Sequence, residues 1–352
     1  MVKITYTSQR GMGSAKRQAH PRKSSTKGEK AVTVVEDLKA NMTLPVIGAP
    51  LFIISNPKLV IEQCRNGVIG SFPALNARPQ EQFEVWLDEI ETTLASLKEQ
   101  EPERRIAPYA VNLIVHPTNK RLQDDLGVCV KHRVPIVITS LHAPTEVVKV
   151  VHDYGGLVFH DVTTVRHARK AIEAGVDGLI LVCAGAGGHA GATSPFALVP
   201  EIRRFYDGPI ALSGSVASGQ SILTAEVLGA DFAYVGTKFI AATEANVPDA
   251  YQQMVLDSAA ADVVYTSAFT GVAGNYLKPS ITAAGLDPDH LAERDSSTMD
   301  WNDGGAKAWK DIWGSGQGVG QIDAVAPAAS IIGALAEQYH QHKALVAQQL
   351  SE

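Results

Sequence analysis

The sequence has few cysteines and no long apolar run, and each shortage excludes a class of protein. The three cysteines, Cys64, Cys129 and Cys183, are too few and too scattered for a disulfide framework or a zinc site, so we expect small buried hydrophobic residues in a reducing compartment. No apolar run approaches the roughly 20 residues that cross a bilayer, and no apolar signal-peptide core follows the basic N-terminus. We therefore predict a cytoplasmic protein that does not bind a membrane.

The histidines also lack a metal-binding pattern. His142, His152, His160 and His167 form no cluster with cysteine or carboxylate at metal-ligand spacing. The prediction is that the chain has no metal site and that most of these histidines lie on the surface.

Positive charge is concentrated at the start of the chain. Residues 1–30 contain eight Lys or Arg and one Glu, so the remaining residues sum to −13 within the net charge of −6. Low hydrophobicity without periodicity predicts a disordered basic arm over residues 1–30. Such an arm suits an organelle transit sequence or a contact with nucleic acid, although a solvated tail is the favoured interpretation. The acidic remainder argues against nucleic acid as the main partner.

From Leu44 onward, short β-rich runs alternate with helical patterns, which is typical of parallel βα units. The eight predicted strands are Val46–Ala49, Gly67–Ser71, Tyr109–Ile114, Pro135–Thr139, Gly156–His160, Gly178–Val182, Pro209–Ser213 and Phe232–Gly236. Eight such units predict an α/β fold, a TIM (β/α)8 barrel with its active site at the C-terminal strand ends. The competing fold is an open doubly wound sheet, which usually has a Gly-x-Gly-x-x-Gly turn after its first strand. Here the first strand ends in Gly-Ala-Pro-Leu.

The strand rhythm stops after the eighth unit. Between about Ala245 and Trp313, helical stretches mix with Gly-, Pro- and Asp-rich turns, which predicts a helical insertion domain after strand eight that caps the barrel mouth. A last helix is expected from Pro327 to about Ala347. The predicted domains are the arm (1–30), the barrel (31–245 plus 314–352) and the substrate-capping insertion (246–313).

A glycine-rich loop with one histidine follows the sixth predicted strand. The stretch Cys183–Gly191 reads Cys-Ala-Gly-Ala-Gly-Gly-His-Ala-Gly, and its glycines allow a flat ligand to approach the backbone closely. His189 is the only side chain there that exchanges a proton near neutral pH. The loop is therefore a candidate active site, and the alternative is a tight turn with a solvated histidine.

Two further loops predict a phosphate site. Ser213–Gly219 follows the seventh strand, and Gly236-Thr237-Lys238 follows the eighth and opens a helix. TIM barrels commonly bind phosphate between these two loops, where backbone N–H groups and the hydroxyls of Ser215 and Thr237 can donate to an anion. Each loop taken alone also fits an ordinary turn and helix cap.

A phosphate at one end and a proton-transfer group at the other suit flavin mononucleotide (FMN). Asn112, at the end of the third strand, can donate to and accept from the edge of a heterocycle, or it can be a turn asparagine. The loop Ala49-Pro50-Leu51-Phe52 is apolar where a polar helix cap is usual, so it can pack on a flat ring or in the core. In the insertion, Tyr265, Phe269 and Tyr276 are candidates for the substrate pocket or for simple core.

The motifs in this order resemble those of the nitronate monooxygenases and related NAD(P)H-dependent flavin oxidoreductases, over roughly residues 44–335. The matching stretches are Gly-Ala-Pro (48–50), Val-Asn-Leu (111–113), Val-Arg-His-Ala (165–168), Gly-Ala-Gly-Gly-His-Ala-Gly (185–191), Ser-Gly-Ser-Val-Ala-Ser-Gly (213–219), Gly-Thr-Lys-Phe (236–239) and Gly-Ser-Gly-Gln-Gly (314–318). The resemblance implies a TIM barrel that binds FMN without a covalent link and carries a helical substrate domain.

The resemblance also implies roles for individual residues. His189 matches the catalytic histidine, Asn112 a flavin contact, and Gly316 and Gln317 a late motif close to the flavin. The full set expected to bind FMN is Ala49, Pro50, Leu51, Asn112, Asp161, Gly187, Gly188, Ser213, Gly214, Ser215, Gly236, Thr237, Gly316 and Gln317.

Two positions depart from the family pattern. Asp161 stands where some nitronate oxidisers have a lysine after strand five, and Gly214-Ser215 replaces the usual Gly-Gly of the phosphate loop. An acid in place of a lysine changes the electrostatics beside a flavin's electron-rich edge.

By resemblance, the reaction is oxidation by O2 of an alkyl nitronate similar to propionate-3-nitronate, with His189 as base or as a donor that orients the nitro group. One alternative is an NAD(P)H-dependent reductase of quinones or enoyl thioesters. Another is a non-catalytic phosphometabolite-binding barrel. A phosphate-binding aldolase or synthase ranks lower, because only Lys238 is a candidate Schiff-base lysine at a strand end. The choice between NADH and NADPH, and between a monomer and a homodimer, stays open.

Overall fold

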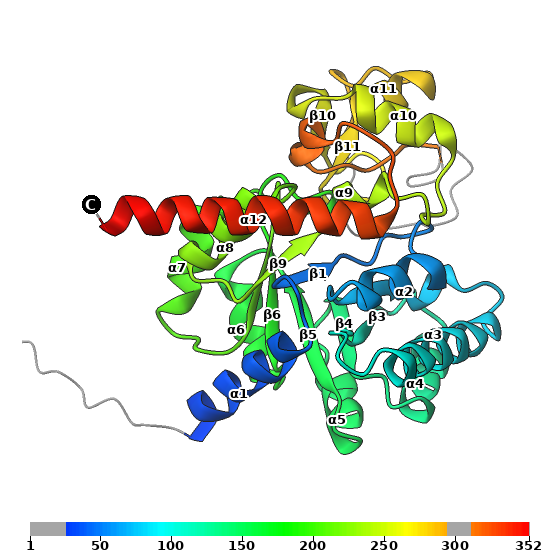
Figure 1. The fold of residues 1–352 in the computed structure, drawn as a ribbon. Helices are drawn as coiled ribbons and strands as arrows, with labels where there is room; N and C mark the ends of the chain where they lie inside the picture. Colours follow the sequence, from blue (N-terminus) through cyan, green and yellow to red (C-terminus); the bar gives the residue numbers. More distant parts are fainter. Residues whose placement is uncertain (1–25, 294–310, 352) are drawn as a thin grey trace, which may run out of the picture.

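The computed structural model describes residues 26–293 and 311–351, with side chains from residue 33 onward. Residues 1–25 of the predicted basic arm therefore lie outside the described residues (Figure 1). Helix α1 (Thr26–Ala40) begins inside the range predicted for the arm. Its Leu38, with Met42 just after it, packs into the apolar cluster inside the barrel, so the helix is anchored through its C-terminal end.

Eight parallel strands form the central sheet, in the order β1-β9-β8-β6-β5-β4-β3-β2. Their bounds are β1 Val46–Gly48, β2 Gly70–Pro73, β3 Tyr109–Val115, β4 Ile136–Leu141, β5 Leu157–Val162, β6 Gly178–Val182, β8 Ile210–Ser213 and β9 Phe232–Val235. A parallel bridge between Ile47 and Ile69 joins the two ends of this order and closes the barrel. The predicted TIM barrel is confirmed. The second strand starts three residues later than predicted, because Gly67 has a φ of +76° and belongs to the preceding turn.

Helices cover the outside of the barrel in the expected alternation (Figure 1). They are α2 Pro57–Arg65, α3 Gln82–Gln100, α4 Leu122–Lys131, α5 Thr145–Asp153, α6 Val165–Glu173, α7 Pro195–Arg203, α8 Gly219–Leu228 and the short α9 Thr237–Ile240. Side chains of Asn56, Thr164 and Ser218 cap the N-termini of α2, α6 and α8 by accepting from the backbone N–H three residues on. The last helix, α12 (Ala328–Ser351), packs against α8 and α2.

Side chains alternate between two apolar layers along each strand. On each strand every second residue points into the barrel, as Ile138 and Phe159 do. The residues between them, such as Val137 and Val158, pack under the helices. This alternation puts polar residues at the last inward position of several strands, facing the mouth of the barrel.

The insertion after strand eight covers the mouth of the barrel (Figure 1). It contains α10 (Asp249–Asp257), the turns η2 (Ala260–Asp262), the strands β10 (Val263–Thr266) and β11 (Gly274–Leu277), and α11 (Lys278–Ala283). A two-residue strand of the histidine loop, β7 (Gly188–His189), joins β10 and β11 in a small antiparallel sheet. The insertion is thus mixed in structure, and it holds the histidine loop directly.

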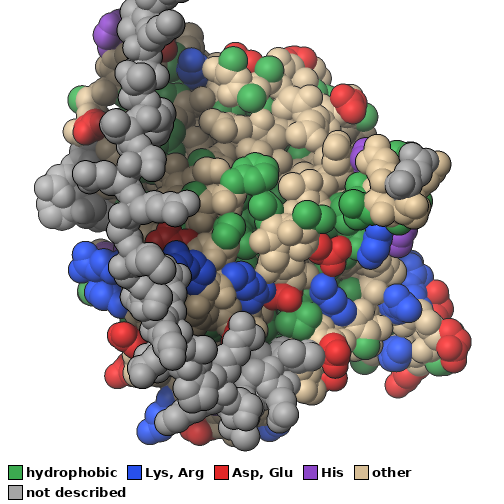
Figure 2. All heavy atoms as spheres, turned by 90° about the vertical axis from the view of Figure 1, so that its left-hand side faces the viewer, with side chains coloured by type: hydrophobic (Ala, Val, Ile, Leu, Met, Phe, Trp, Pro, Cys, Tyr) green, Lys and Arg blue, Asp and Glu red, His purple; other side chains and the backbone are tan. Residues whose placement is uncertain are grey.

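Three features of the described residues correspond to the composition: mixed surface charge, buried cysteines and the lack of a long apolar helix. On the face drawn in Figure 2, basic and acidic side chains are interspersed over the lower half. All three cysteines are free and buried, as expected. Among residues 26–293 and 311–351, no helix has the length and apolar character needed to span a bilayer.

Candidate active site

A cavity of about 690 Å³ lies at the C-terminal ends of the barrel strands, beneath the insertion. Its volume falls within the range of small-molecule and cofactor sites. The lining includes His189 and every residue expected to bind FMN except Gln317: Ala49, Pro50, Leu51, Asn112, Asp161, Gly187, Gly188, Ser213, Gly214, Ser215, Gly236, Thr237 and Gly316. Gln317 opens the turn η4 (Gln317–Gln321) directly behind the lining.

One side of the cavity, which we call the glycine-loop side, is built from Gly185–Gly187, Gly214–Ser215, Gly236–Thr237 and Gly316. The carbonyl oxygen of Gly185 accepts from the backbone N–H of Ser215 at 3.3 Å and of Gln317 at 2.9 Å. The backbone N–H of Gly316 donates to the Thr237 hydroxyl at 2.8 Å. Loops from four places in the sequence are thereby fixed to one another.

At Gly187, Gly214 and Gly316 the space on the glycine-loop side is too small for an added side chain. A Cβ at Gly214 would lie 2.7 Å from the carbonyl oxygen of Ala184, and one at Gly187 would lie 2.8 Å from the backbone nitrogen of Gly316. Gly214 has a φ of +135°, which side chains disfavour, and Ser215 holds a left-handed φ of +55°. No Lys or Arg of the described residues lines the cavity, so an anion here would rest on backbone N–H groups and hydroxyls.

His189 faces the cavity from β7, where it pairs with Gly274 of the insertion. Its Nε2 lies 2.9 Å from the Thr270 hydroxyl, which itself donates to the carbonyl oxygen of Val272. When the hydroxyl gives its proton to that carbonyl, Nε2 of the ring is the donor in this contact. Burial lowers the pKa of His189 to about 4, and the ring is neutral at neutral pH.

The inner end of the cavity, which we call the strand floor, consists of Asn112, Ser140, Asp161 and Tyr234. The Asn112 amide donates to the Ser140 hydroxyl at 2.8 Å, and Ser140 donates to Asp161 Oδ2 at 2.6 Å. Asp161 Oδ1 and the Tyr234 hydroxyl are buried and have no hydrogen-bond partner among the described residues. Burial raises the pKa of Asp161 to about 6, although the hydrogen bond from Ser140 opposes this shift.

The apolar loop after β1 is held in a strained turn beside the glycine-loop side. Ile53 has a φ of +69°, which is rare for a β-branched residue. The Asn76 side chain accepts from the Ile53 N–H at 2.8 Å and donates to the carbonyl oxygens of Leu51 and Ser55 at 2.9 and 2.8 Å. Leu51 in turn packs against Gly236, where a Cβ would lie 3.3 Å from Leu51 Cδ2.

The aromatic residues of the insertion divide between cavity and core. Tyr265 lines the cavity and donates to the Ala190 carbonyl at 2.9 Å. Tyr276 is fully buried and packs edge-on against Phe269 with ring centroids 5.0 Å apart, and neither belongs to the lining. Tyr251, which the sequence did not single out, also lines the cavity and stacks on Trp313.

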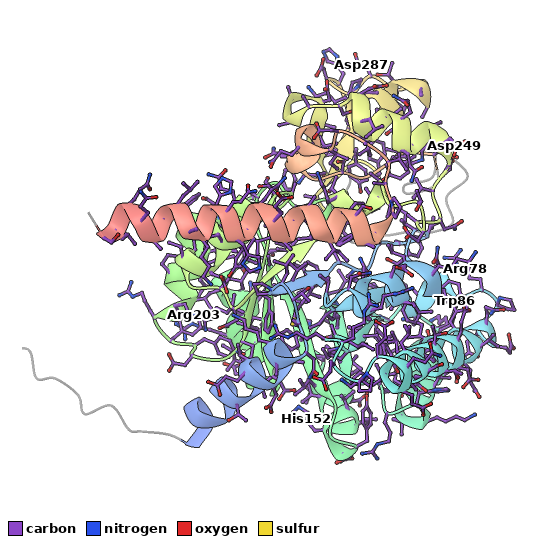
Figure 3. All side chains as sticks on the ribbon, in the orientation of Figure 1. Arg78, Trp86, His152, Arg203, Asp249 and Asp287 are labelled. Carbon is purple, nitrogen blue, oxygen red and sulfur yellow. The ribbon has the colours of Figure 1, made fainter. Side chains whose placement is uncertain are left out.

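Several other lining residues were missed. Ser140 and Tyr234 lie two positions beyond the inward-facing Ile138 and Phe232, so the period-2 alternation of the strands was a usable signal. Thr163, Thr164 and His167 line the mouth near the start of α6. His152, by contrast, lies at the end of the molecule opposite the insertion (Figure 3), where it contacts Asp177 at 2.7 Å.

Comparison with known proteins identifies the family of this chain. A model of the family described as nitronate monooxygenase matches residues 38–337. The Neurospora crassa nitronate monooxygenase is 27% identical over 68% of this chain and 71% of its own length, and the Paraburkholderia phytofirmans enzyme is 25% identical over 69% and 76%. The Rv1533 protein of Mycobacterium tuberculosis is 29% identical, but the match spans only 50% of this chain and 47% of that protein.

Solved structures show the same fold. FabK from Thermotoga maritima has a TM-score of 0.71 at 22% identity, covering 90% of this chain and 98% of its own. The nitroalkane oxidase from Streptomyces ansochromogenes has a TM-score of 0.70 at 20% identity, covering 88% and 99%. The enoyl reductase domain of MlnA from Bacillus amyloliquefaciens has a TM-score of 0.58 at 16% identity, covering 70% and 66%. On the family match, which extends over most of its length, the chain belongs to the nitronate monooxygenase family of flavin-dependent oxidoreductases.

Proposed function

We propose that this chain uses FMN to oxidise alkyl nitronates with molecular oxygen. The observation that carries the proposal, beside the family match, is a single cavity in which His189 faces glycine-rich loops at the ends of β6, β8 and β9. Loops after the last two barrel strands are the usual phosphate site of TIM barrels.

The residues present fit FMN. Gly214, Ser215, Gly236 and Thr237 would hold the phosphate through backbone N–H groups and hydroxyls, and the Thr237 hydroxyl keeps its proton for donation because it only accepts from Gly316. Asn112 and Asp161 would face the polar edge of the ring system, and the buried, unpartnered Asp161 Oδ1 supports a polar ligand there.

Ala49, Pro50 and Leu51 would supply apolar contact to the ring, and Gly187, Gly188, Ser213, Gly316 and Gln317 would allow or support close approach of the backbone. When bound, FMN would take electrons from the nitronate and pass them to O2.

The state of His189 favours a nitronate over a neutral nitroalkane as substrate. A group whose pKa is near 4 is a weak base at neutral pH, and general bases work best when their pKa lies near the working pH. A nitronate has already lost its α-proton and needs no base. Its negative charge would instead favour protonation of the ring, so we propose that His189 orients the bound anion.

The proposal is tested by anaerobic mixing of the purified yellow protein with an alkyl nitronate, with the matching nitroalkane and with NADH. We expect bleaching of the flavin band by the nitronate alone, and release of FMN on denaturation. His189→Asn should keep FMN bound and slow bleaching by about 100-fold, within the range for loss of an acid–base or orienting group.

A second candidate is an NAD(P)H-dependent reductase of quinones or enoyl thioesters. The shared fold with FabK and with the enoyl reductase domain of MlnA favours it. Rapid bleaching by NADH or NADPH, with no reaction with nitronate, would select this candidate. A colourless protein that does not take up FMN would instead leave a non-catalytic phosphometabolite-binding barrel.

A further inference from the structure

Two buried oxygens at the strand floor lack hydrogen bonds within the described part of the chain. They are Asp161 Oδ1 and the Tyr234 hydroxyl, and both residues line the cavity. Tyr234 is only 7% exposed. Because a buried polar group without a partner is costly and rare in native proteins, each of these oxygens calls for a partner from outside the chain.

The two oxygens belong to one local arrangement. Asp161 on β5 and Tyr234 on β9 both occupy the last inward position of their strands, two residues beyond Phe159 and Phe232. Both side chains line the same cavity, and the pKa of the Tyr234 hydroxyl is raised first by burial and then by the negative charge of Asp161. A ligand group entering from the cavity can therefore meet both.

The orientation of the Asp161 carboxylate is fixed from behind. Ser140 accepts from the Asn112 amide, and its own proton goes to Asp161 Oδ2 at 2.6 Å. Oδ1 is left as an acceptor with no donor among the described residues, and the Tyr234 hydroxyl is left as a donor with no acceptor among them. The pair thus matches a ligand edge with an N–H group beside a carbonyl.

We propose that Tyr234 and Asp161 together recognise the imide edge of the cofactor ring, Asp161 accepting from its N–H and Tyr234 donating to an adjacent carbonyl. This inference rests on the proposed binding of FMN, whose ring carries an N3–H between two carbonyls. A nitronate has no N–H and leaves Asp161 unpaired, so the pair fits the cofactor and not the substrate.

The test compares FMN with N3-methyl-FMN, which lacks the imide proton. The affinity of apoprotein for each is measured by flavin fluorescence in the wild type and in Asp161→Asn, Tyr234→Phe and Tyr206→Phe. The wild type should prefer FMN by about tenfold or more, since methylation leaves a buried acceptor unpaired. Tyr206→Phe removes a hydroxyl bonded to the Asp177 carbonyl outside the cavity lining, and both affinities should stay at the wild-type value.

The two floor variants should respond differently. In Asp161→Asn the side-chain oxygen stays with the Ser140 proton, so the amide nitrogen faces the cavity and the preference for FMN should disappear. Tyr234→Phe should weaken both flavins equally, by about tenfold, and leave the preference unchanged. Its apoprotein should be at least as stable as the wild-type apoprotein, because the hydroxyl that is removed has no partner in the protein.

Retention of the full preference for FMN in Asp161→Asn would show that shape alone excludes the methyl group and would overturn the inference. Wild-type FMN affinity in Tyr234→Phe, or a loss of stability in its apoprotein, would do the same. If the wild-type protein binds no FMN, the proposed function fails and this inference with it. If the wild-type protein binds FMN but Asp161→Asn keeps the preference for FMN, or Tyr234→Phe keeps the wild-type affinity, only the inference fails.

Discussion

The glycine-loop side of the cavity and its strand floor differ in how far their hydrogen bonds are already made within the protein. In the loops several groups are already bonded to one another: the Gly185 carbonyl accepts from two backbone N–H groups, and the Thr237 hydroxyl accepts from the Gly316 N–H. On the floor, Asp161 Oδ1 and the Tyr234 hydroxyl have no partner within the described residues. The loops therefore have their shape fixed before a ligand binds, whereas the floor has two oxygens whose hydrogen bonds only a ligand completes. Changes that displace the loops should weaken binding most, whereas changes in the floor should alter selectivity and pH dependence.

The largest effect is expected from a methyl group on the glycine-loop side. Gly214→Ala would add a Cβ 2.7 Å from the Ala184 carbonyl oxygen at a φ of +135°. Displacement of this loop should weaken FMN binding by at least about 100-fold. The measurement is a fluorescence titration of the apoprotein with FMN, with circular dichroism to show that the barrel is folded.

Gly127→Ala is the matched control, because this glycine lies in α4 with no atom within 4 Å of the added Cβ. It should bind FMN as the wild type does and be more stable by up to about 1 kcal/mol. A Gly214→Ala protein that purifies yellow with wild-type affinity would contradict the role given to the loops.

A smaller loss of FMN affinity is expected from a change in the loop after β1, which packs against the glycine-loop side. Asn76→Ala removes the three hydrogen bonds that hold the turn around Ile53, at a cost of roughly 1–3 kcal/mol. We expect FMN affinity to fall by about tenfold, measured by the same titration. Asn41→Ala is the control, since the Asn41 side chain is exposed and, among the described residues, its amide donates only to the Asp37 carbonyl at 3.4 Å.

A second variant tests whether Asn76 acts by holding the strained backbone of Ile53. Glycine adopts a φ of +69° without penalty, so Ile53→Gly added to Asn76→Ala should recover part of the lost affinity. If the double variant is no better than Asn76→Ala alone, Asn76 does not act by holding the strained turn.

The stability of the apoprotein should depend on pH through Asp161 of the floor, and this effect is of intermediate to small size. The folded pKa of Asp161, about 6, is above its ordinary value of 3.8, so its contribution to stability is present below pH 3.8 and is lost as pH rises through 6. The apoprotein of Asp161→Asn should therefore gain stability relative to the wild type between pH 4 and pH 7, by at most about 3 kcal/mol. Urea denaturation at a series of pH values measures this difference, and a difference that stays constant with pH would show that Asp161 ionises normally.

The smallest effect is expected from Ser215→Gly, which restores the usual Gly-Gly of the family. It removes a non-glycine residue at a φ of +55° but also one hydroxyl from the proposed phosphate site. These changes oppose each other, so FMN affinity should change by less than about fivefold. A loss as large as that expected for Gly214→Ala would mean that the hydroxyl, and not the backbone, holds the phosphate.

The sequence was informative wherever the structural signal is local. Each barrel strand is a short apolar run with a turn signal beside it, and the glycine loops adjoin the strand that positions them, so both were predicted with small errors in their bounds. The small sheet of the insertion was not predicted, because β7 has two residues and exists only through its pairing with Gly274 and Asn275.

The floor and the strained turn depend on contacts between distant parts of the chain. The period-2 alternation puts Tyr234 and Ser140 on the same face as Phe232 and Ile138, but barrel closure decides that this face is the inward one. Asn76 is an ordinary loop asparagine in the sequence, and its role follows only from its three bonds to the preceding loop. Among the aromatic candidates, Phe269 and Tyr276 pack in the core of the insertion because they contact each other and not the cavity.

The most direct test of the account is stopped-flow absorbance of the purified, FMN-loaded protein mixed anaerobically with an alkyl nitronate, followed by admission of O2. The account predicts rapid loss of the flavin band with nitronate alone, little reaction with the matching nitroalkane at neutral pH, and return of the band with O2. A flavin band that bleaches only with NADH or NADPH, and is unchanged by nitronate, would contradict it.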